Sequence, residues 1–244
     1  MELRNFFENN PRVALGFSGG ADSSFLLFAA LQAGATVGAY FVKTPFQPEF
    51  EFEDARRLAE QLGADMKVIE FDVLSLENVR SNPKNRCYYC KKALFGLIAQ
   101  RAKADGFPIL IDGTNASDDA GDRLGMKALS ELAVRSPLRE CGITKMRLRE
   151  LSREAGLFTW DKPAYACLAT RIQVNEEIKL EKLEKVERGE AVLVDLGFSD
   201  LRLRLRGKGA RLELPEGQHA VANEKWNDIL GKLADFDTIE LVKR

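Results

Sequence analysis

The residues most capable of chemistry in this sequence are its four cysteines, and two of them, Cys87 and Cys90, lie three apart in the stretch NRCYYCKKALFG. Two thiolates at this spacing can bind one metal centre, form a redox disulfide, or share one turn of a helix. A structural zinc site has all four coordination positions filled by protein ligands. The only histidine, His219, does not stand at a spacing typical of zinc ligands. The residues alone therefore leave zinc, a disulfide and an iron–sulfur ligand set open.

A second candidate site is the loop SGGADSS at residues 18–24. Its adjacent glycines allow close approach of the backbone to a phosphate, and a following helix offers unpaired N–H groups to an anion. Neither the GxxxxGKS/T pattern of nucleoside triphosphatases nor the GxGxxG dinucleotide fingerprint is present. The loop therefore indicates phosphate binding of another kind; the structural alternative is an ordinary strand-to-helix turn with a Ser or Asp cap.

Alternating strands and helices must position these residues in the first half of the chain. Apolar segments predict strands at residues 12–17, 37–42, 66–71 and 108–112, and helical periodicity predicts helices at 23–33, 53–62 and 87–104. This alternation predicts an α/β fold with a doubly wound parallel sheet, in which ligands bind at the carboxyl ends of the strands.

The second half of the chain changes pattern. Helices are expected at 123–132 and 144–155, and the stretch WDKPAYACLATRI at 160–172 reads as an ordered loop. Beyond it we expect a helix (176–196), two strands (201–205 and 210–214), a helix (223–233) and a strand (238–242). The prediction is two domains, residues 1–159 and a smaller α+β domain of residues 160–244.

Composition narrows the range of partners. The 244 residues carry 36 basic and 37 acidic side chains, so no bulk electrostatic field favours nucleic acid or a membrane surface. The start of the sequence lacks the apolar core of a signal peptide, and no apolar run approaches the ~18 residues of a membrane span. We expect a cytoplasmic homo-oligomer, whose reducing surroundings disfavour a disulfide framework.

The loop at residues 18–24 resembles the SGGxDS signature of the PP-loop ATP pyrophosphatases. The resemblance implies that the loop holds the β- and γ-phosphates of ATP while AMP is transferred to a substrate oxygen and pyrophosphate leaves. It also implies that Asp22 lies near Mg²⁺ and that Lys145, at the expected start of a helix, reaches the phosphates; a solvated lysine is the structural alternative. The residues implied around the pyrophosphate are Ser18, Gly19, Gly20, Asp22 and Ser23.

Four segments together resemble the ATP-dependent sulfur transferase LarE family over nearly the whole chain: CYYCKK, DGTNASDD, SPLRECGITK and TWDKPAYACLATRI. The resemblance implies that the first domain binds ATP and the second binds the substrate, a pyridinium dicarboxylate mononucleotide. Its carboxylates would be adenylated and converted to thiocarboxylates for the nickel-pincer nucleotide, with sulfur from a sulfide source. The alternatives are a PP-loop tRNA thiolase and a non-catalytic nucleotide-binding or cluster-carrier module.

Under this resemblance the cysteines acquire expected roles. Cys167 is the sulfur-handling residue, and with Cys87 and Cys90 it would hold a 4Fe–4S cluster whose open iron carries a labile sulfide. In the alternative, Cys167 gives up its own sulfur and the CxxC pair is a bystander; zinc and an oxidised pair also stay open. Cys141 departs from the ligand positions of the family.

Alternating arginines mark the second domain, in the stretch LRLRLRGKG. On a strand, Arg202, Arg204 and Arg206 share one face and the leucines the other. Guanidinium groups bind carboxylate and phosphate in bidentate fashion, and the resemblance implies substrate binding at Arg202 and Arg204. Arg206 replaces a residue that is often histidine, and a solvent-facing basic strand is the structural alternative. Arg171, close to Cys167 in sequence, is also expected to contact substrate or pyrophosphate.

Overall fold

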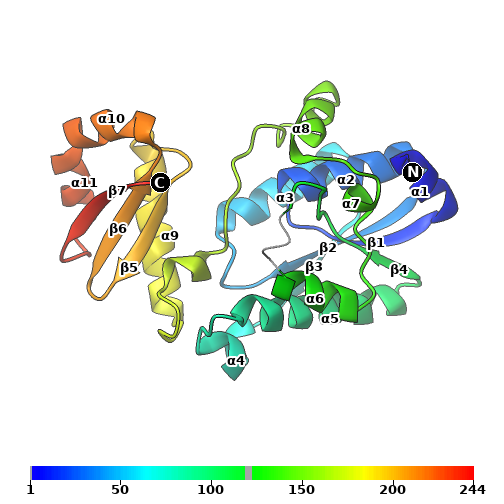
Figure 1. Ribbon diagram of the computed structural model, residues 1–244, viewed down its shortest axis with the longest axis horizontal. Helices are drawn as coiled ribbons and strands as arrows, with labels where there is room; N and C mark the ends of the chain where they lie inside the picture. Colours follow the sequence, from blue (N-terminus) through cyan, green and yellow to red (C-terminus); the bar gives the residue numbers. More distant parts are fainter. Residues whose placement is uncertain (1, 119–122) are drawn as a thin grey trace. The chain divides into compact units, whose positions relative to one another are not determined.

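The computed structural model describes residues 2–118 and 123–244, and the chain divides into two compact units (Figure 1). The larger unit comprises Met1–Thr44, Glu49–Asp72 and Asn85–Lys162, and the smaller one comprises Pro45–Pro48, Val73–Lys84 and Pro163–Arg244. The main division follows Lys162, where the sequence predicted a boundary between residues 159 and 160. Two short segments of the first half belong to the smaller unit. The roles expected of the two parts stay predictions.

A four-stranded parallel sheet, counted over the described residues, forms the centre of the larger unit. Its strands are β1 (Arg12–Gly16), β2 (Thr36–Lys43), β3 (Met66–Glu70) and β4 (Ile109–Ile111), in the order β3-β2-β1-β4. Val13 of β1 pairs in parallel with Val37 on one side and with Ile109 on the other. The predicted α/β fold with a parallel sheet is confirmed.

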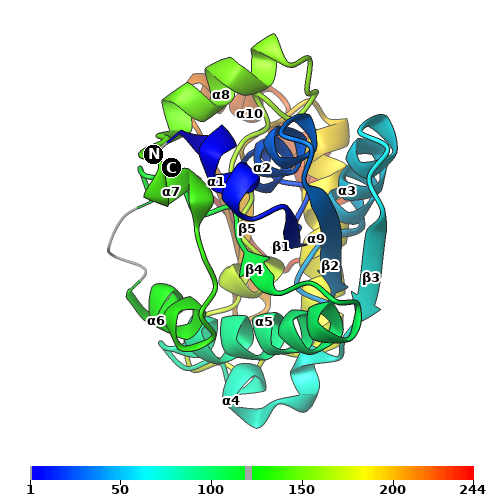
Figure 2. The same ribbon diagram turned by 90° about the vertical axis from the view of Figure 1, so that its right-hand side faces the viewer.

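Helices cover both faces of this sheet. They are α1 (Leu3–Asn9), α2 (Ala21–Gln32), α3 (Glu49–Gln61), α5 (Arg86–Ala104), α6 (Arg123–Glu131), α7 (Pro137–Glu140) and α8 (Lys145–Glu154). Val13 and Leu15 pack into a core with α1, α2, α3 and α8, whereas Ala14 packs into a second core with α5. Figure 2 shows α2 and α8 on one side of the strands and α5 on the other. Because alternate strand residues point to opposite faces, two cores explain why β1 is apolar and buried from Val13 to Leu15.

The smaller unit is a three-stranded sheet with helices, again counted over the described residues. Its strands are β5 (Arg202–Arg206), β6 (Gly209–Leu214) and β7 (Ile239–Lys243), with β5 antiparallel and β7 parallel to β6. Its helices are α4 (Glu77–Arg80), α9 (Leu180–Asp195), α10 (His219–Glu224) and α11 (Trp226–Lys232), and short 3₁₀ turns lie at Val73–Ser75, Leu168–Arg171 and Glu216–Gln218. Leu203 and Leu205 of β5 are buried while the arginines that alternate with them are not, as the alternation predicted.

The start of α9 differs from the sequence prediction. The helix begins at Leu180 rather than at residue 176, because the chain before it runs against the segment Val73–Lys84. Asn175, with a φ of +67°, donates its N–H to Asn82 O at 2.8 Å, and Ile178 donates its N–H to Arg80 O at 2.8 Å. These backbone bonds take the place of a first helical turn, and they attach Val73–Lys84 to the smaller unit.

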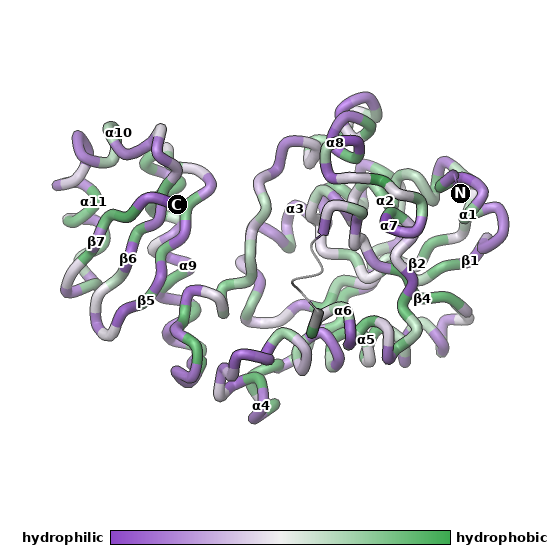
Figure 3. The backbone as a smooth tube through the Cα atoms, viewed as in Figure 1, coloured by the Kyte–Doolittle hydropathy of each residue, from purple (hydrophilic) through white to green (hydrophobic). Residues whose placement is uncertain are grey.

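The distribution of hydrophobic residues agrees with this arrangement of strands and helices. Figure 3 shows β4 in hydrophobic colours and α8 as mainly hydrophilic. In the described parts of the chain, no helix has the length and apolar character that crossing a membrane requires.

Candidate active site

The loop between β1 and α2 is shaped by glycine. Gly19 has a φ of +69°, and a Cβ atom there would lie 2.7 Å from the Cβ of Ala55 on α3. A side chain at this position is therefore excluded both by backbone strain and by contact. Gly20 is the N-cap of α2, so no side chain covers the helix N-terminus from that position. The arrangement leaves backbone N–H groups at the start of a helix, which is a general anion-binding geometry.

Two serines of this loop form hydrogen bonds with other groups of the same loop. The Ser18 and Ser23 hydroxyls lie 3.1 Å apart, and the Ser18 N–H donates to Ser23 Oγ at 3.2 Å. Ser23 Oγ also donates to Gly20 O at 3.3 Å. The structure thus brings Ser18, Gly19, Gly20 and Ser23 together at the start of α2. Their contact with ATP stays a prediction.

The structure also brings Asp22 and Lys145 together, although 123 residues separate them. Lys145 begins α8, and its Nζ lies 2.6 Å from Asp22 Oδ2. The second Asp22 oxygen, Oδ1, accepts a hydrogen bond of 3.1 Å from Nδ2 of Asn115. Asn115 lies in the segment DGTNASDD, whose last residue, Asp119, is outside the described residues. The sequence marked this segment but not Asn115 itself.

A buried carboxyl follows β4 beside this group. Asp112 accepts hydrogen bonds from the hydroxyls of Ser136, at 2.6 Å, and of Thr114. Burial raises the pKa of Asp112, and the hydrogen bonds from the two hydroxyls counter that increase in part. The next residue, Gly113, packs so closely on α2 that a Cβ there would lie 2.9 Å from Ser23 N. The loop after β4 is therefore fixed against the first turn of α2.

Cys87 and Cys90 lie in the first turns of α5, in the larger unit. Residues three apart on a helix share a face, so the two thiols can serve one metal centre. Arg86, which is buried, donates from Nη2 to Cys87 Sγ at 3.9 Å. Cys87 is exposed and Cys90 partly so, and no cysteine in the described residues is disulfide-bonded.

Cys141 has different surroundings. It is half-buried at the end of α7 and packs against the core of the larger unit, and burial raises the pKa of its thiol. A raised pKa disfavours the thiolate that binds metals or attacks electrophiles. The structure therefore gives Cys141 the surroundings of a packing residue.

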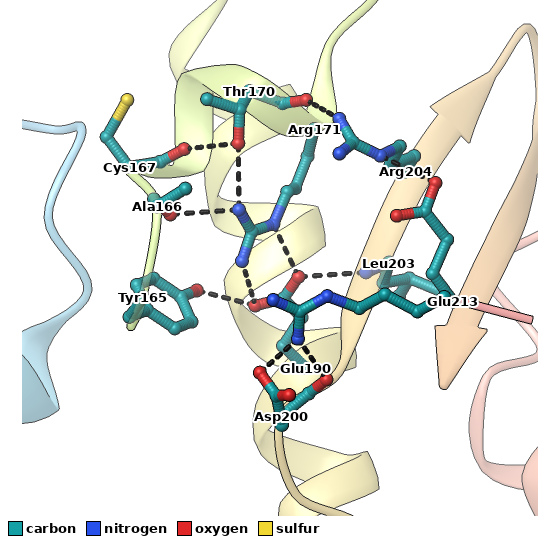
Figure 4. Close-up of polar contacts among 11 residues, drawn as sticks. Tyr165, Ala166, Cys167, Thr170, Arg171, Glu190, Asp200, Leu203, Arg204 and Glu213 are labelled. Atoms are coloured by element: carbon teal, nitrogen blue, oxygen red, sulfur yellow. Dashed lines mark hydrogen bonds and ion pairs between the residues drawn. The ribbon is translucent and has the colours of Figure 1, made fainter. Parts of the chain in front are cut away.

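Cys167 lies in the smaller unit, directly before the 3₁₀ turn Leu168–Arg171 (Figure 4). Its carbonyl accepts hydrogen bonds from the Thr170 N–H and hydroxyl, both at 2.9 Å. Leu168 is fully buried and donates its N–H to Phe46 O at 2.9 Å. Figure 4 shows the sulfur of Cys167 pointing away from the polar network behind it. The backbone that carries this thiol is thus held at several points.

Arg171 is the centre of that network, with only 1% of its side chain exposed. Its Nε and Nη2 donate to the two carboxylate oxygens of Glu190 at 2.7 and 3.2 Å, and its Nη1 donates to Ala166 O and Thr170 Oγ1, both at 2.8 Å. The Tyr165 hydroxyl donates to Glu190 Oε2 at 2.5 Å. Every guanidinium nitrogen of Arg171 is used by a protein group, which favours a positioning role over the predicted ligand contact.

The arginines of β5 differ from one another. Arg204 donates to Glu213 Oε1 at 2.7 Å and to Thr170 O, so it ties β5 to the turn after Cys167. Arg206 is exposed. Burial lowers the pKa of Arg202, and the positive charges of Arg244, Arg171 and Arg204 lower it further. Among the described residues no hydrogen bond or ion pair of the Arg202 side chain is found. An unpaired guanidinium among other cations favours an anionic ligand.

The described residues contain no group of three or more His, Cys, Asp or Glu side chains arranged to hold a metal ion. Cys87 and Cys90 belong to the larger unit and Cys167 to the smaller one. A ligand set formed from all three thiols therefore stays a prediction.

Comparison with known proteins places this geometry in a family. No protein-family model matches the chain. An uncharacterized protein of Synechocystis is 37% identical over 88% of this chain and 81% of its own length. An uncharacterized protein of Methanocaldococcus jannaschii is 30% identical over 93% of this chain and 86% of its own length. Weaker matches include an argininosuccinate synthase and a tRNA-specific 2-thiouridylase, which share the PP-loop fold.

The relatives with named activities are ATP-utilising synthases and sulfur transferases, and the protein is an ATP-dependent enzyme. A relative with a named activity that matches over most of the chain is the pyridinium-3,5-bisthiocarboxylic acid mononucleotide synthase of Lactiplantibacillus plantarum, which is 33% identical over 91% of this chain and 82% of its own length. The chain therefore belongs to the pyridinium-3,5-bisthiocarboxylic acid mononucleotide synthase family, LarE.

Proposed function

We propose that this enzyme adenylates the carboxylates of pyridinium-3,5-dicarboxylate mononucleotide and converts them to thiocarboxylates, for nickel-pincer nucleotide biosynthesis. The observation that carries the proposal is the Cys167 turn, which a hydrogen bond from Arg204 to Thr170 O joins to the arginine-bearing strand β5. It occurs in a chain that also has the SGGADSS loop. A thiol and unpaired cationic charge suit sulfur transfer to a substrate that carries carboxylates and a phosphate.

The first step activates a carboxylate. A substrate carboxylate oxygen attacks the α-phosphorus of ATP, the bond to the β-phosphate breaks, and pyrophosphate leaves with that electron pair. Ser18, Gly19, Gly20, Asp22, Ser23 and Lys145 hold the pyrophosphate group in this proposal. Mg²⁺ near Asp22 would neutralise the negative charge that develops on the leaving group.

The second step transfers sulfur. Sulfide attacks the acyl carbon of the adenylate, the bond to the AMP oxygen breaks, and the products are a thiocarboxylate and AMP. Arg202 and Arg204 hold the anionic groups of the substrate. If Cys167 instead attacks the adenylate with its own sulfur, AMP leaves and a thioester forms. Loss of the Cα proton to a base and cleavage of the Cβ–Sγ bond then release the thiocarboxylate and leave dehydroalanine.

The cysteine pair on α5 bears on the source of the sulfur. The shared helix face of Cys87 and Cys90 fits two ligands of one iron–sulfur centre. With Cys167 as a third ligand, a bound 4Fe–4S cluster would supply an open iron to carry sulfide. Iron and sulfide analysis of the anaerobically purified protein tests this part of the proposal. We expect a brown protein that loses its chromophore in Cys87→Ala, whereas a colourless protein whose Cys167 loses the mass of H₂S on turnover supports sacrificial chemistry.

Variants separate the two chemical steps. Asp22→Ala should abolish pyrophosphate release from ATP, whereas Cys167→Ser should keep pyrophosphate release but form no thiocarboxylate. Cys141→Ser is the matched control, because Cys141 packs against the core and has no role in the proposed reaction. Thiocarboxylate from Cys167→Ser, or undiminished pyrophosphate release from Asp22→Ala, would contradict the assignment of the residues.

A tRNA thiolase is the second candidate. A tRNA-specific 2-thiouridylase is 27% identical over 63% of this chain and 54% of its own length. The net charge of −1 does not provide the basic field that such binding usually uses. A salt-dependent affinity for tRNA, with sulfur incorporated into the RNA, would favour this function over the first.

A further inference from the structure

The loop after β4 connects the first turns of two helices in the larger unit. The Ala116 N–H donates to Ile143 O at 2.8 Å, and the Lys145 N–H donates to Ser117 Oγ at 2.9 Å, so the loop is attached to the start of α8. The loop also lies against α2, where only a glycine fits at position 113. It is therefore a rigid link between the helix that carries Asp22 and the helix that carries Lys145.

Asn115 is the side chain at the centre of this link, and only 1% of it is exposed. Its Oδ1 accepts the Ser117 N–H at 2.7 Å, and its Nδ2 donates to Asp22 Oδ1 at 3.1 Å. Its own N–H donates to Asp118 Oδ2 at 2.8 Å. Because a backbone N–H requires an acceptor, the amide orientation is determined, with its donor toward Asp22.

The two oxygens of Asp22 therefore have unlike partners. Oδ1 is held by a buried neutral amide, and Oδ2 by the Lys145 ammonium, in an ion pair whose side chains are 30% and 29% exposed. A cation can displace another cation from a carboxylate oxygen, but it cannot take the place of a fixed amide donor without breaking the loop. A partly exposed ion pair is also weak enough to exchange.

We propose that Asn115 is a positioning residue that fixes Asp22 Oδ1, so that Oδ2 exchanges Lys145 for a divalent cation when a nucleoside triphosphate binds. The exchange frees the ammonium for the phosphates and keeps the charge around Asp22 balanced. This inference rests on the proposed function, in which Asp22 and Lys145 act at the pyrophosphate. It adds a residue that the reaction steps above do not use.

The test measures metal affinity rather than turnover. Mn²⁺ binding to the full-length protein is followed by electron paramagnetic resonance, with and without an ATP analogue that has a methylene bridge between the α- and β-phosphates. Binding of the analogue in the absence of metal is measured by calorimetry. Asn115→Ala should weaken Mn²⁺ binding in the analogue complex by about tenfold, since one hydrogen bond to a charged group is lost. Metal-free analogue binding should change by less than about twofold, because it does not need the exchange.

Three further variants complete the design. Asn115→Ser can still accept the Ser117 N–H but is too short to reach Asp22, so it should reproduce Asn115→Ala if that variant folds poorly. Ser117→Ala removes a loop contact to α8 and leaves the Asp22 contacts in place, so it should keep the wild-type metal affinity. Lys145→Met removes the competitor for Oδ2 and should strengthen Mn²⁺ binding to the nucleotide-free protein.

The outcomes are distinguishable. An equal loss of metal and metal-free analogue affinity in Asn115→Ala and Asn115→Ser would overturn the positioning role, because it would indicate a general loss of structure. No loss of either affinity would also overturn it. If Asp22→Asn weakens Mn²⁺ binding while both Asn115 variants do not, the inference fails and the proposed function stands. If Asp22→Asn has no effect, the proposed pyrophosphate site fails as well.

Discussion

The buried pair of Arg171 and Glu190 gives a sharp prediction for the smaller unit. Glu190→Gln keeps the size of the side chain but removes the negative charge beside a guanidinium that is 1% exposed. The amide also turns one acceptor into a donor, which meets the donors of Arg171 and Tyr165. Breaking a buried pair from one side costs about 3–5 kcal/mol. For a unit of about 100 residues, that loss lowers the thermal midpoint by more than about 10 °C.

Calorimetry of the full chain measures this loss against a matched control. Glu184→Gln makes the same substitution at an exposed position of α9, and it should change stability by less than about 0.5 kcal/mol. The double variant Arg171→Met, Glu190→Leu removes both charges and should recover part of the loss. Recovery should be partial because the Tyr165 hydroxyl and the Leu203 N–H lose their acceptor.

The single variant Glu190→Gln should also loosen the turn that carries Cys167. Arg171 joins Glu190 to Ala166 and Thr170, on either side of the thiol in sequence. Alkylation of Cys167, located by peptide mass spectrometry, should therefore change rate in Glu190→Gln and not in Glu184→Gln. A thermal midpoint of Glu190→Gln within about 2 °C of the control would refute the claim that the pair holds this part of the unit.

Three other outcomes are expected. Gly19→Ala should lose affinity for an ATP analogue by at least about tenfold, because the new Cβ meets Ala55; equal affinities in calorimetry would contradict the loop geometry. The raised pKa of Asp112 means that its carboxyl favours the folded state when protonated. The stability of the wild type relative to Asp112→Asn should thus fall as pH rises from the ordinary pKa of Asp through the raised one, and denaturant titrations that show the opposite trend would refute this. Arg202→Leu should raise the substrate KM about tenfold or more, whereas Arg206→Leu on the same strand should alter it less than twofold; equal effects would argue against an anion site at Arg202.

Much of the larger unit could be predicted from local sequence. The central strands β1 and β2 are largely buried on both faces, so each is a mainly apolar segment that can be detected in the sequence, whereas the edge strand β3 is only partly buried. The SGGADSS loop can be recognised from its own glycines and from its place between a predicted strand and a predicted helix. The close packing of Gly19 on Ala55 agrees with the expected need for glycine in this loop, although the sequence alone did not identify Ala55 as the contacting residue.

The contacts that complete the candidate sites depend on tertiary structure. Asn115 meets Asp22 only because β4 and β1 are neighbours in the sheet. Glu190 was not among the predicted site residues, because α9 carries many charged side chains and one more carboxylate does not stand out in its sequence. A signal was present: Leu183, Val186, Glu190 and Leu193 follow the spacing of one helix face, and all four are buried. A single acid on an apolar helix face predicts a buried cationic partner.

The central claim is that this chain adenylates a pyridinium dicarboxylate mononucleotide and replaces oxygen with sulfur. The most direct measurement is mass spectrometry of the product after anaerobic incubation with this substrate, MgATP and sulfide enriched in a heavy sulfur isotope. We expect a thiocarboxylate that carries the heavy isotope, formed together with AMP and pyrophosphate. A product with unlabelled sulfur and a Cys167 converted to dehydroalanine would contradict delivery from sulfide. Absence of any sulfur-containing product, with no consumption of ATP, would contradict the proposed function itself.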